Sequence, residues 1–430
     1  MYNDSIDILK FTQLHTLDVD RNKTTSFFNV EANELIINLY LNRHIAKCVF
    51  CSSTNTVIKE TRKKLINHCI IPNKKITIIF HQKKFKCKEC NHTFMEFNPI
   101  GDGISNLAIA EIINSLRNPR KTFSDVSKER FTSIPTVQSK FDEHVKLDRH
   151  ILNKVICFDE IYAKKLTKTK YSFLIYDPFK NLIIDVLDAR RKNVLENYFL
   201  HIPLKERLKV THINIDMWQT YLNVAEEYLP NATICVDSFH VIEHLNKAMD
   251  KVRLKIQKKF IEYKSSNRKD NYWLLKTFHY YLTSNFDNIK YVRKPKSHYG
   301  YLVDKFAVLH ELLSIDEELK KAYQLKSEYM EFNLVEEYSQ ESTYKLEDFI
   351  DRFKASTYQE FREFGDLLKR WKIYIVNSFI RIDGKRLSNG PMESLNGRIK
   401  RIISDGYGYK DFNRFRNRVM FSLNKNEPIK

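Results

Sequence analysis

Long hydrophobic runs are absent from this sequence, and no apolar stretch approaches the roughly 18–20 residues that a membrane-spanning helix needs. The first residues, MYNDSIDILKF, lack a basic stretch followed by an apolar core, so we expect no signal peptide. Cysteine is scarce and odd in number, with 7 in 430 residues, which does not resemble the disulfide framework of a secreted protein. We therefore expect a cytoplasmic protein with no membrane contact.

Acidic residues are too few to balance the basic ones. The chain has 72 Lys and Arg against 53 Asp and Glu, which gives a formal net charge of +19. A surplus of this size usually indicates a polyanionic partner, most often nucleic acid. A coding bias that favours lysine, asparagine and isoleucine would produce the same surplus without any partner. Because 43% of the residues are hydrophobic, the chain can bury sizeable cores and is not a disordered protein.

Four of the cysteines form two CxxC pairs, separated by a segment with strand character over 75–80. Two such pairs can supply four thiolates to a tetrahedral Zn²⁺ ion. Four thiolates leave no open coordination position, so we predict a structural zinc site and not a catalytic one. The predicted ligands are Cys48, Cys51, Cys87 and Cys90, and the nearby side chains that could replace one of them are His68, Cys69, His81 and His92.

Residues 101–150 show the pattern of a helix-turn-helix. A short helix over 124–131 precedes a longer one that ends at about 145, which Ser133 can cap and Pro135 can begin. In such a motif the second helix enters the major groove of DNA. A plain three-helix packing unit gives the same pattern, but the adjoining zinc module and the basic charge favour DNA binding. The candidates that would face the groove are Thr136, Gln138, Ser139 and Lys140.

Acidic residues stand at the predicted ends of three short apolar strands in the middle of the chain. Asp159 follows a strand over 154–158, and Asp216 follows one over 212–215. Two strands and a helix lie between them, which gives the β-β-β-α-β order of an RNase H-like domain. Asp159 and Asp216 would then lie on adjacent central strands, close enough to share metal ions. A further strand ends at Asp237, and His240 follows three residues later.

A third acid, Glu393, lies in the first turn of a predicted helix, beyond a long segment with helical spacing. Carboxylate oxygens are hard ligands that suit Mg²⁺ or Mn²⁺. Two such ions bridged by a shared aspartate can activate a water or a 3′-hydroxyl and stabilise the leaving oxygen of a phosphodiester. We therefore predict that Asp159, Asp216 and Glu393 are the catalytic residues and the ligands of two metal ions.

Basic side chains interleaved with aromatic ones follow Glu393 to the end of the chain. This pattern suits contact with phosphates combined with stacking on bases. An amphipathic last helix with phenylalanines in a core gives the same pattern, and we expect both, with the aromatic residues packed and the arginines facing DNA. The DNA-binding candidates here are Arg398, Lys400, Arg401 and Arg416.

Together these motifs resemble the ISL3 family of insertion-sequence transposases over essentially the whole chain. The matching stretches are the two CxxC pairs, FDE at 158–160, IDMWQTY at 215–221, DSFHVIEHLNKAMDKVR at 237–253 and SNGPMESLNGRIKRI at 388–402, followed by GYGYKDFNRFRNR. The resemblance implies a DDE transposase, and it carries the catalytic triad onto Asp159, Asp216 and Glu393. The implied fold class is an α/β RNase H-like catalytic core with a large all-helical insertion, preceded by a small zinc-binding module and a helix-turn-helix.

Asp237 and His240 resemble a (C/D)xxH signature of related transposase families. There the pair supports the geometry of the site and the scissile strand and does not bind the metals. From the residues alone, His240 could equally be a hydrogen-bonded core histidine or contact a DNA phosphate. Ser394 departs from the small, glycine-like residue that the resemblance leads us to expect after Glu393, which leaves the acid itself unaffected.

The expected function is transposition, in which the protein binds terminal inverted repeats, cleaves donor DNA and joins the 3′-ends to target DNA. We expect a homo-oligomer on double-stranded DNA, at least a dimer, associated with a bacterial nucleoid. The alternatives are a catalytically silent DNA-binding regulator and a nuclease of hybrids or junctions, which would not need two DNA-reading modules. The predicted domains are a helical arm (1–46, with a helix over 31–45), the zinc module (47–100), the helix-turn-helix (101–150), the first part of the core (151–253), the helical insertion (254–385) and the final helices with Glu393 (386–430).

Overall fold

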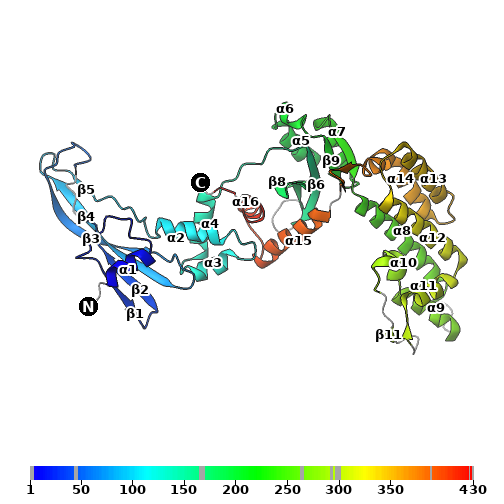
Figure 1. Cartoon of the computed structure of the whole chain (residues 1–430), viewed down its shortest axis with the longest axis horizontal. Coiled ribbons are helices and arrows are strands. Elements are labelled where there is room, and N and C mark those ends of the chain that lie inside the picture. The colour runs from blue at the N-terminus through cyan, green and yellow to red at the C-terminus, as the bar shows by residue number, and fades with distance from the viewer. Residues whose placement is uncertain are drawn as a thin grey trace. The chain divides into compact units, whose positions relative to one another are not determined.

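The computed structural model describes residues 4–42, 47–163, 170–261, 266–290, 294–295, 302–387, 390–425 and 427–428. It forms two compact units, one of Met1–Asp148 with Arg398–Lys430 and one of Arg149–Gly397. The second boundary falls inside helix α15 (Gly390–Asp405), so the last helix, α16 (Phe412–Leu423), belongs to the first unit. Figure 1 shows α16 beside the helices of that unit.

A mixed sheet dominates the N-terminal half of the first unit. Its strands run in the order β1-β2-β4-β3, with β5 also paired to β4, and β2 and β4 are parallel. Helix α1 (Asp4–Phe11) precedes it. The strand bounds are β1 Thr25–Asn29, β2 Glu34–Leu39, β3 Thr56–Asn67, β4 Lys75–Cys87 and β5 Thr93–Met95.

The predicted helix over 31–45 is wrong, because Glu34–Leu39 forms strand β2; residues 43–46 lie outside the described part. Ile37 and Leu39 alternate into the core, where they meet Ile78 of β4 and its neighbours. The adjacent apolar residues in ELIINL imitate helical spacing, whereas the β partner lies about 40 residues away in the chain. The expected helical arm therefore contains one short helix and two strands.

Three capped helices follow in the first unit: α2 (Asn106–Ser115), α3 (Phe123–Glu129) and α4 (Ile134–His144). The last two lie where the sequence predicts a short helix and a longer one that ends at about 145. Ser133 accepts a hydrogen bond from the backbone N–H of Thr136, which satisfies one of the free donors at the start of α4. Phe141 of α4 is fully buried and makes edge-to-face contacts with Phe123 and with Phe421 of α16. Helix α16 therefore contributes to the same hydrophobic core as α3 and α4.

A five-stranded α/β sheet forms the first half of the second unit, in the order β10-β9-β6-β7-β8. Strands β10, β9 and β6 are parallel, and β7 and β8 continue antiparallel. Three helices accompany it: α5 (Lys192–Leu200), α6 (Leu204–Arg207) and α7 (Gln219–Tyr228). The strand bounds are β6 Val155–Tyr162, β7 Tyr171–Asp177, β8 Leu182–Leu187, β9 His212–Ile215 and β10 Thr233–Val236.

The rest of the second unit is helical in its described residues, apart from a 3₁₀ turn (Phe286–Asn288) and two strand pairs of two residues per strand. Edge-to-face aromatic contacts fill its core, with Tyr329 against Phe349, Phe353 and Phe364. No helix in the described residues is long and apolar enough to cross a membrane. The helices are α8 Ser238–Lys258, α9 Ser266–Thr277, α10 Tyr280–Thr283, α11 Lys305–Ser314, α12 Glu317–Val335, α13 Gln340–Lys354 and α14 Gln359–Asn377.

Helix α14 covers the edge of this sheet that strand β10 forms. The Asn377 side-chain amide donates to the Ile234 carbonyl at 2.9 Å, and the Cys235 thiol donates to the Asn377 carbonyl at 3.3 Å. These bonds use polar groups of the edge strand that would otherwise face solvent or another chain. The strand pair β13–β14 (Arg381–Ile382 with Lys385–Arg386) then returns the chain to the sheet, and α15 begins after it.

Candidate active site and cysteine cluster

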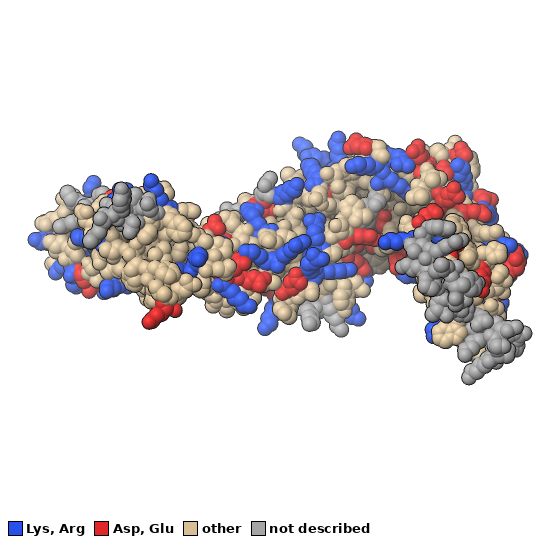
Figure 2. Space-filling model, turned by 60° about the horizontal axis from the view of Figure 1, so that its bottom comes forward, with Lys and Arg blue, Asp and Glu red and all other residues tan. Residues whose placement is uncertain are grey.

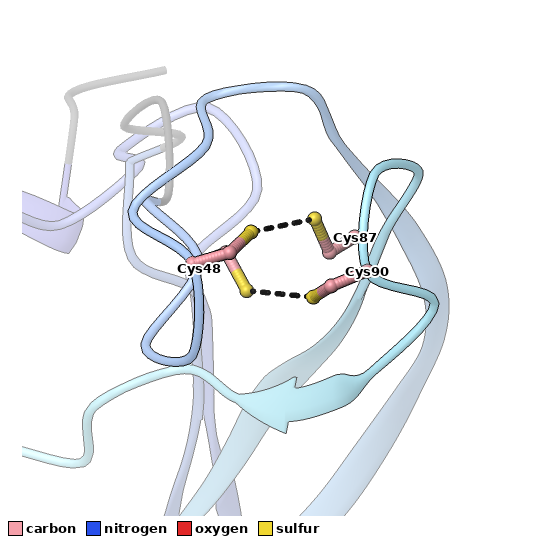
Figure 3. Close-up of side chains that lie close together, drawn as sticks. Cys48, Cys87 and Cys90 are labelled. Carbon is pink, nitrogen blue, oxygen red and sulfur yellow. Dashed lines mark hydrogen bonds between the residues drawn. The ribbon is translucent and has the colours of Figure 1, made fainter.

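The two CxxC pairs meet in the first unit. Cys48 Sγ lies 3.5 Å from Cys90 Sγ, and Cys51 Sγ lies 3.6 Å from Cys87 Sγ (Figure 3). All four sulfur atoms lie within 4.8 Å of one another. Zn–S bonds of about 2.3 Å in a tetrahedron place sulfur atoms roughly 3.8 Å apart. The cluster therefore fits a single Zn²⁺ ion without rearrangement of the chain.

Backbone hydrogen bonds favour the thiolate form of Cys87, one of these four cysteines. The backbone N–H groups of Cys90 and Glu89 hydrogen-bond to the Cys87 sulfur and lower the pKa of that thiol to about 7, which favours the thiolate. The possible substitute ligands are engaged elsewhere: His68 binds Ser105 and the Thr12 carbonyl, and His81 stacks on Tyr40. His92 stacks on Phe50, and Cys69 contacts the backbone of Ile76. The four cysteines are therefore the candidate zinc ligands, and none of these other side chains is needed to replace one.

The structure brings Asp159 and Asp216 together through the register of two parallel strands. Cys157 of β6 pairs with Asn214 of β9, and two more residues along each strand reach Asp159 and Asp216. Neighbouring strands lie about 4.8 Å apart, and residues two positions apart point to the same face. Asp216 directly follows β9, as predicted. Asp159 lies inside β6 and not at its end, because the strand continues to Tyr162.

Asp159 is 8% exposed and is held by two hydrogen bonds. The Asn396 side-chain amide donates to its Oδ2 at 2.7 Å, and the backbone N–H of Glu160 donates to its Oδ1 at 2.6 Å. Burial, with a further contribution from the negative charge of Asp216, raises the pKa of Asp159 to about 7. Two carboxylates this close repel one another when both are ionised, and a bound cation would relieve that repulsion.

His240 lies in the first turn of α8 and pairs with the second acid. Its Nε2 lies 2.9 Å from Asp216 Oδ1, and its Nδ1 lies 3.4 Å from Glu243 Oε2. Burial by itself would lower the pKa of His240, but the hydrogen bond and the charge of Asp216 outweigh burial and raise it to about 9. His240 is therefore an imidazolium at neutral pH, and it carries a positive charge beside the acids.

Glu393 is exposed in the first turn of α15. Asn396, one turn further along the same face, makes the contact with Asp159, so α15 meets the sheet at this acid. In the described residues the four cysteines are the group of potential ligands gathered closely enough to hold a metal ion, and the three acids do not form such a group. The structure thus places Asp159 beside Asp216 and puts Glu393 on the helix that touches Asp159.

A family model for ISL3-type DDE transposases, described as "Transposase", matches residues 156–419. This chain belongs to the ISL3 transposase family. The matched segment covers more than half of the chain and runs from β6 to α16, so it includes all three acids. A search of curated proteins finds no match. As a member of the family, the protein is a transposase of the insertion-sequence kind, and membership implies DNA as the partner and the use of a divalent metal ion.

In this transposase the predicted groove-facing residues lie along α4, and two of them are paired with an acid. Ser139 Oγ donates to Glu143 Oε1 at 2.9 Å, and Lys140 Nζ donates to Glu143 Oε2 at 2.8 Å. The Thr136 hydroxyl lies 2.7 Å from that of Ser133, and Gln138 is half-buried. Contact of Ser139 and Lys140 with phosphates would require both side chains to leave Glu143.

The basic residues near the C-terminus divide into two groups. Arg398, Lys400 and Arg401 are exposed on α15, and Figure 2 shows lysine and arginine side chains gathered over the part of the molecule that holds α15 and α16. Arg416 donates to the Leu147 carbonyl at 2.7 Å. The expectation that the arginines of the last helix face DNA is wrong for Arg418, which is buried and bound to backbone carbonyls.

Asn396 belongs to the site through its contact with Asp159, although no sequence motif singled it out. It lies inside the SLNGR stretch, three residues after Glu393, and three-residue spacing on a helix places the two side chains on one face. The three-residue spacing from Glu393 is the feature of this transposase sequence that could have identified Asn396. Ser388 and Asn389, which begin the same motif, lie outside the described residues.

Proposed function

We propose that this transposase is a DDE enzyme with an RNase H-like core, which binds terminal inverted repeats, cleaves donor DNA and joins the 3′-ends to target DNA. The observation that carries the proposal is the arrangement of the acids. Asp159 and Asp216 extend from neighbouring parallel strands, and α15 brings Glu393 to the same end of the sheet through the contact of Asn396 with Asp159.

The donor set fits Mg²⁺ or Mn²⁺, since Asp159, Asp216 and Glu393 offer oxygen ligands alone. When bound, two such ions would activate the attacking water or 3′-hydroxyl and stabilise the leaving oxygen. The chain itself orients the ligands: Asn396 donates to one oxygen of Asp159, and His240 pairs with one oxygen of Asp216. Asp237 is buried at the N-cap of α8, and its backbone N–H donates to the Ile215 carbonyl at the end of β9.

DNA recognition is assigned to the first unit, with the zinc module and the helix-turn-helix of α2 to α4 as separate domains. Helix α4 presents its capped N-terminal turn, the part of a recognition helix that contacts base edges. The exposed basic residues of α15 lie beyond Glu393 on the same helix and would contact phosphates near the cleaved strand. We propose an active complex of at least two chains on DNA in the bacterial cytoplasm. The proposed DNA-contacting residues are Thr136, Gln138, Ser139, Lys140, Arg398, Lys400, Arg401 and Arg416.

The test is a cleavage assay on DNA that carries the inverted repeats flanking the gene. Wild-type protein should cleave at the repeat ends with Mg²⁺, whereas Asp216→Ala should bind the ends with unchanged affinity and fail to cleave. If Asp216→Ala cleaves as the wild type does, the assignment of the acids is wrong. If wild-type protein binds the ends and cleaves with neither Mg²⁺ nor Mn²⁺, the protein is a silent regulator that retains the fold.

A further inference from the structure

Arg190 lies between two aromatic rings at the edge of the acid pair. It follows β8, in the short connection to α5. Its guanidinium carbon is 4.2 Å from the centre of the Tyr171 ring and 4.5 Å from the centre of the Trp218 ring. Tyr171 begins β7, and Trp218 follows β9, so the two rings come from opposite sides of the central strand β6. Arg190 therefore bridges three strands of the sheet.

The edge of the same guanidinium pairs with an acid of the central strand. Arg190 forms an ion pair with Glu160 of β6, and the Tyr221 hydroxyl of α7 donates to Glu160 Oε2 at 3.3 Å. Tyr221 is fully buried and packs against Phe158 and Trp218. Arginine suits this place because its planar group can stack on both faces and still donate hydrogen bonds from its edge.

Each end of this bridge is attached to the chain next to a proposed metal ligand. Glu160 follows Asp159, and its backbone N–H donates to Asp159 Oδ1 at 2.6 Å. Trp218 is two residues after Asp216, and its backbone N–H donates to the Asp216 carbonyl at 2.6 Å. A shift of Glu160 or Trp218 would therefore move the backbone that carries one acid relative to the backbone that carries the other.

We propose that Arg190 is a positioning residue that holds Asp159 and Asp216 at a fixed separation and thereby sets the affinity of the pair for a divalent cation. The proposal rests on the proposed function, because it takes the two acids to be metal ligands. Arg190 also neutralises Glu160, so that a third negative charge does not add to the repulsion between the two acids. Supporting residues of this kind typically contribute roughly 10- to 100-fold to metal affinity.

Arg190→Lys is the sharpest variant, because it keeps the positive charge and loses the planar group that stacks on both rings. Arg207→Lys is the matched control. Arg207 also lies over a tyrosine, Tyr228, at 5.8 Å and donates to the Tyr228 and Ile202 carbonyls, but it contacts neither acid nor its neighbours. Trp218→Phe is a second, milder variant that removes part of one stacking face and keeps the apolar packing.

The experiment is a titration of the full-length protein with Mn²⁺, read by electron paramagnetic resonance, with Asp159→Asn as the reference for specific binding. We expect Arg190→Lys to bind Mn²⁺ about tenfold more weakly than wild type, Trp218→Phe to shift in the same direction, and Arg207→Lys to match wild type. In cleavage, excess Mg²⁺ should restore the rate of Arg190→Lys, which a general folding defect would not allow.

Wild-type Mn²⁺ affinity in folded Arg190→Lys, as judged by its circular dichroism spectrum, would overturn the role of Arg190 and leave the acid assignment standing. An equal loss in Arg207→Lys would also overturn it, because the effect would then be one of general stability. If wild-type protein shows no Mn²⁺ binding that Asp159→Asn removes, the proposed metal site fails, and the role of Arg190 fails with it.

Discussion

Arg418 offers the clearest prediction on stability, because a fully charged side chain is buried where the sequence suggested contact with DNA. It is 1% exposed, and its guanidinium donates to the carbonyls of Leu116, Asn118 and Lys121. Burial lowers the pKa of Arg418. These carbonyls end α2 and form the loop that leads to α3, so one side chain of α16 donates to the acceptors of the turn between α2 and α3.

Replacement of Arg418 by methionine keeps most of the side-chain volume and removes all three bonds. Hydrogen bonds from a charged donor contribute about 1.5–3 kcal/mol each, but the native state also carries the cost of a guanidinium held out of water. Partial entry of water to the freed carbonyls reduces the loss further. We therefore expect Arg418→Met to lower the free energy of unfolding of the first unit by about 3–5 kcal/mol.

Urea denaturation followed by circular dichroism measures this loss, which corresponds to a midpoint about 2 M lower for a slope of about 2 kcal/mol per molar. Arg414→Ala on the same helix is the control. Its ion pair with Asp142 is partly exposed, so that variant should lose about 1 kcal/mol or less. A midpoint for Arg418→Met within the range of the control would show that the three carbonyls do not depend on Arg418.

Three further predictions concern the zinc cluster, His240 and helix α4. Metal analysis should find about one zinc per chain in the wild type and none in Cys87→Ser, and a metal-free wild type would contradict the cluster. In metal-free protein, the raised pKa of His240 adds stability that is complete below about pH 6.5 and is lost as pH rises to about 9. The difference in unfolding free energy between wild type and His240→Gln should fall over that range, and a constant difference would argue against the Asp216 pair. Glu143→Gln should release Lys140, tighten DNA binding and steepen its salt dependence by about one phosphate contact, and an unchanged slope would place Lys140 away from DNA.

The parts of the fold that the sequence predicted correctly depend on local signals. Ser133 and Pro135 mark the start of α4 because capping involves groups within one turn of the chain. The strands before Asp216 and Asp237 are short β-prone runs that end at an acid, and this pattern needs no knowledge of the partner strand. The zinc site could also be predicted from the two CxxC pairs alone, because four thiolates at this spacing have few other uses.

The features that the sequence did not predict correctly depend on residues that lie far away in the chain. Strand β2 is decided by pairing with β4, and its own apolar residues fit a helix as well as a strand. Arg418 looked like a DNA contact because no local pattern shows that three carbonyls about 300 residues away need donors. Arg190 had no signal in the sequence, because its role depends on two rings and an acid that come from β7, from the loop after β9 and from β6.

A change of metal preference would show whether Asp216 is a ligand of the catalytic cations. Asp216→Cys replaces an oxygen ligand with a thiolate, which Mg²⁺ accepts poorly and Mn²⁺ accepts better. We expect Asp216→Cys to bind the terminal repeats, to fail to cleave them in Mg²⁺ and to regain cleavage in Mn²⁺. Cleavage by Asp216→Cys in Mg²⁺ at the wild-type rate would show that Asp216 is not a metal ligand and would contradict the account.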